Sequence, residues 1–183
     1  RQGSATGPIS NSCQADAEAL GIGLGPRKIL PDYVWSYELG SKNRLMNGRL
    51  SLDTSLYQIN WSQIQSGLFL PNCNVPITAN FGDARSRGFD FTLNVAATDS
   101  TTLGFSVGYT DAEYTTDTEG ANDVLIRPKG EPLPIAPWTA TLSGEQTFSL
   151  GANRGYLRTD FQYRSKNGTP VPTNLPAVDP TIP

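Results

Sequence analysis

Alternation of apolar and polar residues is the feature that most constrains this chain of 183 residues. Six runs show the alternation, at residues 33–39, 50–56, 89–95, 103–109, 138–144 and 157–163. A period of two residues is that of a β-strand with one apolar face and one polar face. Helical periodicity is nearly absent, and only residues 13–20 are compatible with a short helical turn. We therefore expect an all-β fold built from antiparallel strands.

The connections between these runs alternate between short and long. The short connections are predicted at 43–48, 98–101 and 151–154. The first contains Asn47-Gly48, a strong hairpin signal. The long connections are predicted at 62–76, at 117–137 and after residue 165. Short turns at one end and long loops at the other are typical of outer-membrane barrels, whose long loops face outside. The pattern predicts an up-and-down meander of about six strands from a larger transmembrane β-barrel.

Aromatic residues of the predicted strands gather toward the end with the long loops. Trp and Tyr form belts at membrane interfaces because an amphipathic ring suits the headgroup region. The predicted lipid-facing and belt residues are Trp35, Trp61, Phe105, Tyr109, Trp138 and Tyr163. The alternative is that aromatic residues are simply common in strands. In the second strand the apolar phase shifts from Leu56 to Tyr57. A β-bulge would explain that shift, and so would emergence of the strand from the membrane.

The charged residues of the strands fall in the polar phase of the alternation. They are Glu38, Asp53, Asp90, Arg158 and Asp160. On a lipid-facing surface near the midplane a basic side chain costs about 2–4 kcal/mol, and an acidic one somewhat less. We therefore expect the polar face to line a wet lumen. The positions most sensitive to an added charge are expected in the apolar phase, at Leu93, Phe105 and Leu142.

Composition excludes several classes and indicates a piece of a longer protein. A net charge of −3 without a basic cluster argues against nucleic-acid binding. No apolar run approaches the roughly 20 residues of a membrane helix. The only methionine is Met46, no signal peptide is seen, and residues 170–183 are rich in proline. Six strands are also too few to close a bacterial barrel. We therefore expect an internal fragment.

Cys13 and Cys73 are the only cysteines, and both fall in predicted extracellular loops. An exported protein occupies an oxidising compartment, which favours a disulfide between these two loops. Two free thiols, or pairing outside the fragment, remain alternatives. A zinc site is not expected, because two cysteines without any histidine do not make a usual ligand set.

The remaining motifs indicate neither catalysis nor a cofactor. Residues 21–25 are rich in glycine but lack the flanking strand and helix of a phosphate-binding loop. The absence of histidine removes the usual base of a catalytic triad. An acidic stretch fits no calcium-binding EF-hand, and its members are Asp111, Glu113, Asp117, Glu119 and Asp123. We expect no enzyme activity. A last group, Asp83, Arg85, Arg87 and Asp90, is expected to form structural ion pairs.

Several segments carry a family resemblance, in order and with suitable spacing. Residues 80–90 read NFGDARSRGFD and resemble the strand motif N-x-G-x-A-x-S-x-G-F-E of TonB-dependent outer-membrane receptors. Residues 30–42 resemble that family's P-E-x-x-x-x-Y-E-x-G-x-K strand, and residues 55–65 its F-Y-I-D-W-x-D-I-Q strand. A G-Y-T-x-A-x-Y strand is matched by residues 108–114, and a Pro-Trp strand entry by Pro137-Trp138.

The resemblance implies a barrel of about 22 strands that contains a plug domain. Such receptors reside in the outer membrane of Gram-negative bacteria and import scarce ligands such as ferric siderophores, haem, cobalamin or oligosaccharides. A TonB-type energy-transducing protein drives them through a motif near the receptor's N-terminus. This chain matches the C-terminal half of the barrel and lacks the plug and the coupling motif. The expected organisation is an extracellular loop at 1–31, six barrel strands at 32–165 and a truncated loop at 166–183.

An active uptake receptor is therefore the leading functional hypothesis, with an iron chelate as the default small-molecule ligand. The loops at 62–74 and 117–134 are expected to face that ligand. A passive porin-type channel is the first alternative, because it shares the alternation. A soluble β-sandwich that serves binding or adhesion is the second, because a sandwich also buries one face of each strand.

Overall fold

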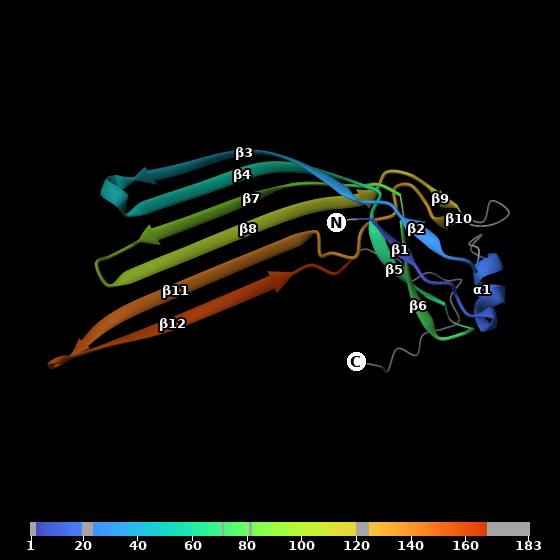
Figure 1. The fold of residues 1–183 in the computed structure, drawn as a ribbon. Coiled ribbons are helices and arrows are strands. Elements are labelled where there is room, and N and C mark those ends of the chain that lie inside the picture. The colour runs from blue at the N-terminus through green and yellow to red at the C-terminus, as the bar shows by residue number, and fades with distance from the viewer. Residues whose placement is uncertain (1–2, 20–23, 71, 81, 120–124, 168–183) are drawn as a thin grey trace.

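Six long antiparallel strands form one sheet in the structure, a computed structural model that describes residues 3–19, 24–70, 72–80, 82–119 and 125–167. Their spatial order is β12-β11-β8-β7-β4-β3, a meander of three hairpins (Figure 1). The bounds are β3 (Tyr33–Leu45), β4 (Leu50–Ser62), β7 (Ala84–Ala96), β8 (Thr101–Tyr114), β11 (Trp138–Leu150) and β12 (Asn153–Arg164). The prediction of an antiparallel six-stranded meander is confirmed.

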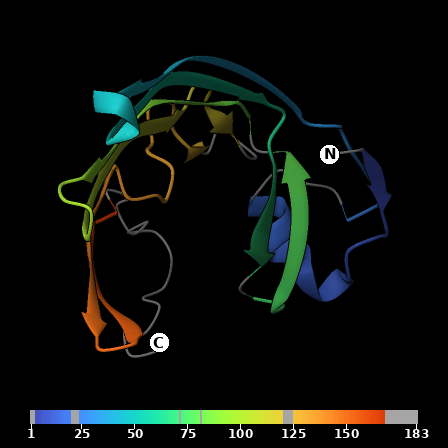
Figure 2. The ribbon, with the colours of Figure 1, turned by 90° about the vertical axis from the view of Figure 1, so that its left-hand side faces the viewer.

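The sheet is bent into an arch, as a segment of a barrel wall would be (Figure 2). The three short turns lie together at one end of the strands (Figure 1). The first is a turn of 3₁₀-helix, η2 (Met46–Gly48), in which Asn47 and Gly48 have φ of 56° and 86°. Asparagine and glycine are the residues that best tolerate this left-handed backbone, so the Asn-Gly pair sets the first turn.

Strand pairing is unbroken throughout the paired residues of the sheet, so residues directly opposite one another share a face. The apolar phases therefore line up in rows that run across the strands. One such row is Leu39, Leu56, Phe89, Tyr109 and Trp138. Another, four residues farther toward the short turns, is Asn43, Leu52, Leu93, Phe105, Leu142 and Phe161. Together they give the sheet one continuous apolar face.

The opposite face carries small and charged side chains in matching rows. One row is Lys42, Asp53, Thr92, Ser106, Thr141 and Gln162. Glycines let polar side chains lie flat on this face. Tyr57 reaches across Gly88 to place its hydroxyl 2.6 Å from the Thr110 hydroxyl. We call this surface the polar face.

Short elements within the long connections gather at the other end of the sheet (Figure 1). They are β1 (Ser4–Thr6), η1 (Asn11–Cys13), α1 (Gln14–Ala19), β2 (Arg27–Ile29), β5 (Gln65–Leu70), β6 (Val75–Asn80), β9 (Thr118–Glu119) and β10 (Leu125–Arg127). The expected helical turn is α1, and the two-stranded antiparallel sheets β1-β2, β5-β6 and β9-β10 lie where the sequence predicts long loops. Within the described ranges, no helix has the length and apolar character to cross a membrane.

The buried apolar clusters also lie at this loop end. One contains Ile9, Cys13, Leu70 and Ile77, and the other contains Ile64, Ala84 and Tyr114. The apolar face of the sheet is instead exposed in this chain. Leu39 is 74% exposed and Phe161 is 65% exposed. Burial in the protein therefore stabilises the loops, whereas the sheet presents its apolar side chains outward.

Candidate functional site

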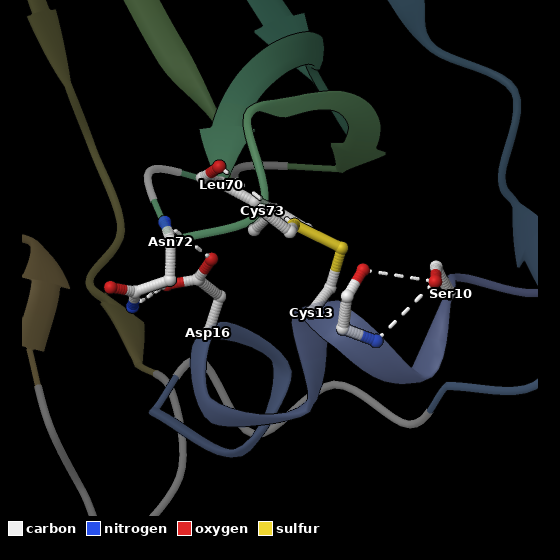
Figure 3. The surroundings of a disulfide bond; sticks show 7 residues. Ser10, Cys13, Asp16, Leu70, Asn72 and Cys73 are labelled. Carbon is white, nitrogen blue, oxygen red and sulfur yellow. Dashed lines mark hydrogen bonds between the residues drawn. A yellow bond between two sulfur atoms is a disulfide. The ribbon is translucent and has the colours of Figure 1, made fainter.

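The N-terminal loop and the β5-β6 hairpin are joined at their tips by three contacts (Figure 3). A disulfide links Cys13 to Cys73, with their Cα atoms 5.0 Å apart. Beside it, the backbone N–H of Asn72 donates to Asp16 Oδ2 at 3.0 Å, and the Asn72 amide donates to Asp16 Oδ1 at 2.5 Å. Asp16 is nearly buried, so this carboxylate replaces its water with two protein donors. The sequence pattern does not predict a role for Asp16 or Asn72.

A second set of bonds ties the base of the same loops together. Asn80 accepts from the Leu30 N–H at 2.8 Å and donates to the Leu30 carbonyl at 3.0 Å and the Gln63 carbonyl at 2.7 Å. The Gln65 amide also donates to the Leu30 carbonyl at 2.9 Å. The predicted ligand-facing loop at 62–74 is therefore half of a β-hairpin, held at both its base and its tip.

Removing the disulfide is expected to loosen this loop assembly without unfolding the sheet. In the Cys13→Ser/Cys73→Ser double variant, cleavage by trypsin after Lys28 in β2 should accelerate roughly tenfold or more, because the bond restrains a long chain segment. Lys42 in β3 should stay protected because its backbone is paired with β4. Timed proteolysis of the membrane-inserted protein, read by mass spectrometry, measures both rates. Equal acceleration at the two lysines would show instead that the bond stabilises the whole sheet.

The second predicted ligand-facing loop, at 117–134, divides into two parts. From Gly130 onward the chain pairs with the end of β8. Gly130 donates to the Tyr114 carbonyl at 2.8 Å, and Leu133 donates to the Ala112 carbonyl at 2.8 Å. Near the tip, the Arg127 guanidinium lies 4.5 Å from the centroid of the Tyr114 ring. Residues 120–124, which include the acidic Asp123, lie outside the described part of the chain.

The arginines of β7 form ion pairs with β8, not with their neighbours in sequence. Arg85 lies 2.6 Å from Glu113, and Arg87 lies 2.9 Å from Asp111. Asp83 instead accepts from the Gln63 N–H at 2.8 Å. The prediction that these arginines enter structural ion pairs therefore holds with different partners. Over the described ranges, no group of three or more acidic or cysteine side chains is arranged to hold a metal ion.

Five of the six predicted belt residues share the apolar face of the sheet. They are Trp35, Phe105, Tyr109, Trp138 and Tyr163. Three rings form a cluster at the loop end of this face. The Trp138 ring centroid lies 4.7 Å from that of Tyr109 and 6.0 Å from that of Phe89.

Trp61 is the sixth, and its predicted facing is wrong. Its direct partners are Val34 and Ala84, so it lies on the polar face, opposite to Trp35. The Trp61 indole donates to Asp32 Oδ2 at 2.9 Å, and the ring packs against the buried cluster that contains Ile64. The shift of apolar phase after Leu56 involves no bulge, because the pairing of β4 is regular. At this end of β4, Trp61 packs against the buried cluster at the loops instead of joining the apolar face.

A comparison with known families agrees with this geometry. The family described as TonB dependent receptor-like, beta-barrel matches residues 10–180, nearly the whole chain. Its members are outer-membrane transport receptors and not enzymes. The match covers all six strands of the arched sheet and the elements at its loop end other than β1. The chain belongs to the β-barrel family of the TonB-dependent receptors.

Proposed function

We propose that this chain forms part of the barrel wall of an energy-coupled receptor, with its apolar face in lipid and its polar face toward the lumen. The exposed apolar rows are the observation that carries the proposal. A soluble sandwich would have to bury Leu39 and Phe161, which are 74% and 65% exposed. In a membrane the same side chains are in their preferred solvent.

The aromatic residues support this orientation because their position along the strand shifts steadily from one side of the sheet to the other. Trp35 lies two rows closer to the loops than Tyr109 and Trp138, whereas Tyr163 lies one row closer to the turns. At the opposite end, β11 continues beyond Gly144 to Leu150, whereas β3 ends in the row of Gly144, at Leu45. Both ends of the sheet therefore shift in the same direction. Strands tilted by roughly 40° within a bilayer produce such a shift.

We propose an iron chelate as the ligand and the loops at 62–74 and 117–134 as the segments that face it. Iron chelates are the commonest ligands of the family that this chain resembles. The attachment of the β5-β6 hairpin to the N-terminal loop supports a firmly held binding surface at the mouth. The proposed organisation remains loop 1–31, strands 32–165 and loop 166–183. A TonB-type protein of the Gram-negative envelope would act as the energy-transducing partner.

Uptake of radioactive ferric chelates by cells whose only high-affinity iron receptor contains this chain tests the proposal. Uptake of at least one chelate is expected, and it should stop when the proton gradient is collapsed. Uptake that continues without the gradient would favour the passive porin-type alternative. If the receptor reaches the outer membrane but no chelate of a broad panel is taken up, the iron assignment is wrong.

A further inference from the structure

On the apolar face of the sheet, the rows nearest the loops contain polar and charged residues in a regular order. Two successive rows run across β3, β4, β7 and β8, and each contains an aromatic residue, an amide, an arginine and a carboxylate in that order. They are Tyr37, Gln58, Arg87 and Asp111, and then Trp35, Asn60, Arg85 and Glu113. We call these eight residues the amide–arginine surface.

A hollow of about 270 Å³ lies at the loop end of this surface, which contributes Gln58, Asn60 and Arg85 to its lining. Gln58 and Asn60 line it from β4, Arg85 lines it from β7, and Asp83 lines it from the position just before β7. The Gln58 amide donates to the Asn60 side-chain carbonyl at 3.3 Å, which leaves the Asn60 amide nitrogen free to donate into the hollow. The hollow therefore offers hydrogen-bond donors and acceptors side by side.

The charges of the surface are balanced across the strands. Arg85 pairs with Glu113 at 2.6 Å and Arg87 pairs with Asp111 at 2.9 Å. An isolated phosphate would have to compete with these carboxylates for the guanidinium groups, and it would meet their repulsion. A neutral, hydroxyl-rich group both donates and accepts, so it can bond to the amides and the ion pairs without breaking either.

Two exposed aromatic rings of β3 belong to the same two rows, next to the β4 residues that line the hollow. Trp35, directly opposite Asn60, is 68% exposed, and Tyr37, directly opposite Gln58, is 59% exposed. An exposed ring beside polar groups can pack against the C–H face of a sugar ring while its hydroxyls bond to neighbouring side chains. Aromatic rings for the C–H face of a sugar, and amide, guanidinium and carboxylate groups for its hydroxyls, therefore lie together on this surface.

We propose that the amide–arginine surface binds the saccharide headgroup of a glycolipid in the outer leaflet of the membrane. The surface begins one row above Leu56 and Phe89, so acyl chains seated on the apolar rows would bring their headgroups to it. The proposal depends on the apolar face lying in lipid, and it is independent of the transported ligand.

The test uses the intact receptor in nanodiscs that contain either a glycolipid with an oligosaccharide headgroup or phosphatidylglycerol. Lipid retained after transfer to mild detergent is counted by native mass spectrometry. The test variant is Asn60→Leu, and the matched control is Asn43→Leu. Asn43 lies on the same face of the neighbouring strand, in a row near the turns. Trp35→Leu is a second test variant that leaves the hollow polar.

We expect the unaltered receptor to retain the glycolipid in preference to phosphatidylglycerol. Asn60→Leu should lower glycolipid retention by about fivefold, and Trp35→Leu by a similar factor, whereas Asn43→Leu should have no effect. Equal retention of the two lipids would mean that the surface recognises no sugar, and would overturn the proposal. Equal losses in Asn60→Leu and Asn43→Leu would overturn it too. If retention is normal in all three variants, the saccharide lies elsewhere. Failure of the apolar face to contact any lipid would instead contradict the barrel placement itself.

Discussion

Replacing Phe105 with arginine is expected to prevent most of the protein from assembling in the outer membrane, whereas arginine at Ser106 should leave assembly intact. Phe105 lies on the apolar face directly between Leu93 and Leu142. Its ring centroid is 6.2 Å from that of Phe91. An arginine in the middle of a lipid-facing surface costs about 2–4 kcal/mol, and loss of the ring contact adds to that cost.

Ser106 is the matched control because it is adjacent in sequence and opposite in facing. Its hydroxyl lies 3.1 Å from that of Thr92 on the polar face, where a charged side chain has neighbours such as Lys42 and Asp53 in the same row. The amount of folded receptor in outer-membrane fractions, and its unfolding by urea, measure the outcome. If the two arginines impair assembly equally, the assignment of the faces is wrong.

A methyl group at Gly88 is expected to destabilise the sheet strongly. A Cβ atom there would lie 2.0 Å from the Tyr109 carbonyl oxygen and 2.6 Å from the Tyr57 hydroxyl. The carbonyl belongs to the paired backbone of β8, so it cannot move away without disturbing the ladder between β7 and β8. For Gly88→Ala we expect a loss of about 1–3 kcal/mol in the free energy of unfolding.

Gly144→Ala provides the control for the added methyl group. A Cβ atom at Gly144 would lie 3.6 Å from Leu103 Cδ2, an ordinary van der Waals contact. Urea unfolding of the intact receptor should show a loss for Gly88→Ala and almost none for Gly144→Ala. Adding Tyr57→Phe to Gly88→Ala removes the hydroxyl but keeps the backbone contact. Full rescue by that second change would show that the Tyr57 hydroxyl, rather than the ladder, limits the space.

The main sheet was predictable because its physical requirement is local. A strand with one side in an apolar medium must place apolar residues at every second position, and six runs do so. Unbroken pairing then brings these phases into rows without further information. The regularity fails at the loop end of β4, where Trp61 and Ile64 contribute to a buried cluster. There the apolar side chains pack against the loops, and the two-residue period of a strand does not predict where those loops lie.

The ion pairs show that a sequence can indicate which residues form ion pairs more easily than which residue pairs with which. The sequence predicts ion pairs for Arg85 and Arg87, and the nearest acidic residues in sequence are Asp83 and Asp90. Asp90, however, lies on the opposite face of β7 from Arg87. Same-face neighbours on one strand are about 6.6 Å apart, whereas directly opposite residues on paired strands have Cβ atoms about 5 Å apart. Glu113 and Asp111 are the closer partners once the register is known.

The bond between Cys13 and Cys73 also has a consequence for how the protein is built. Both strands of the first hairpin, β3 and β4, lie between the two cysteines in the sequence. Once the bond has formed, this part of the chain is a closed covalent ring without a free end. A ring cannot be threaded into a bilayer one strand at a time, so β3 and β4 must enter together. Oxidation ahead of insertion would therefore make the hairpin, and not the single strand, the first unit of assembly in this region.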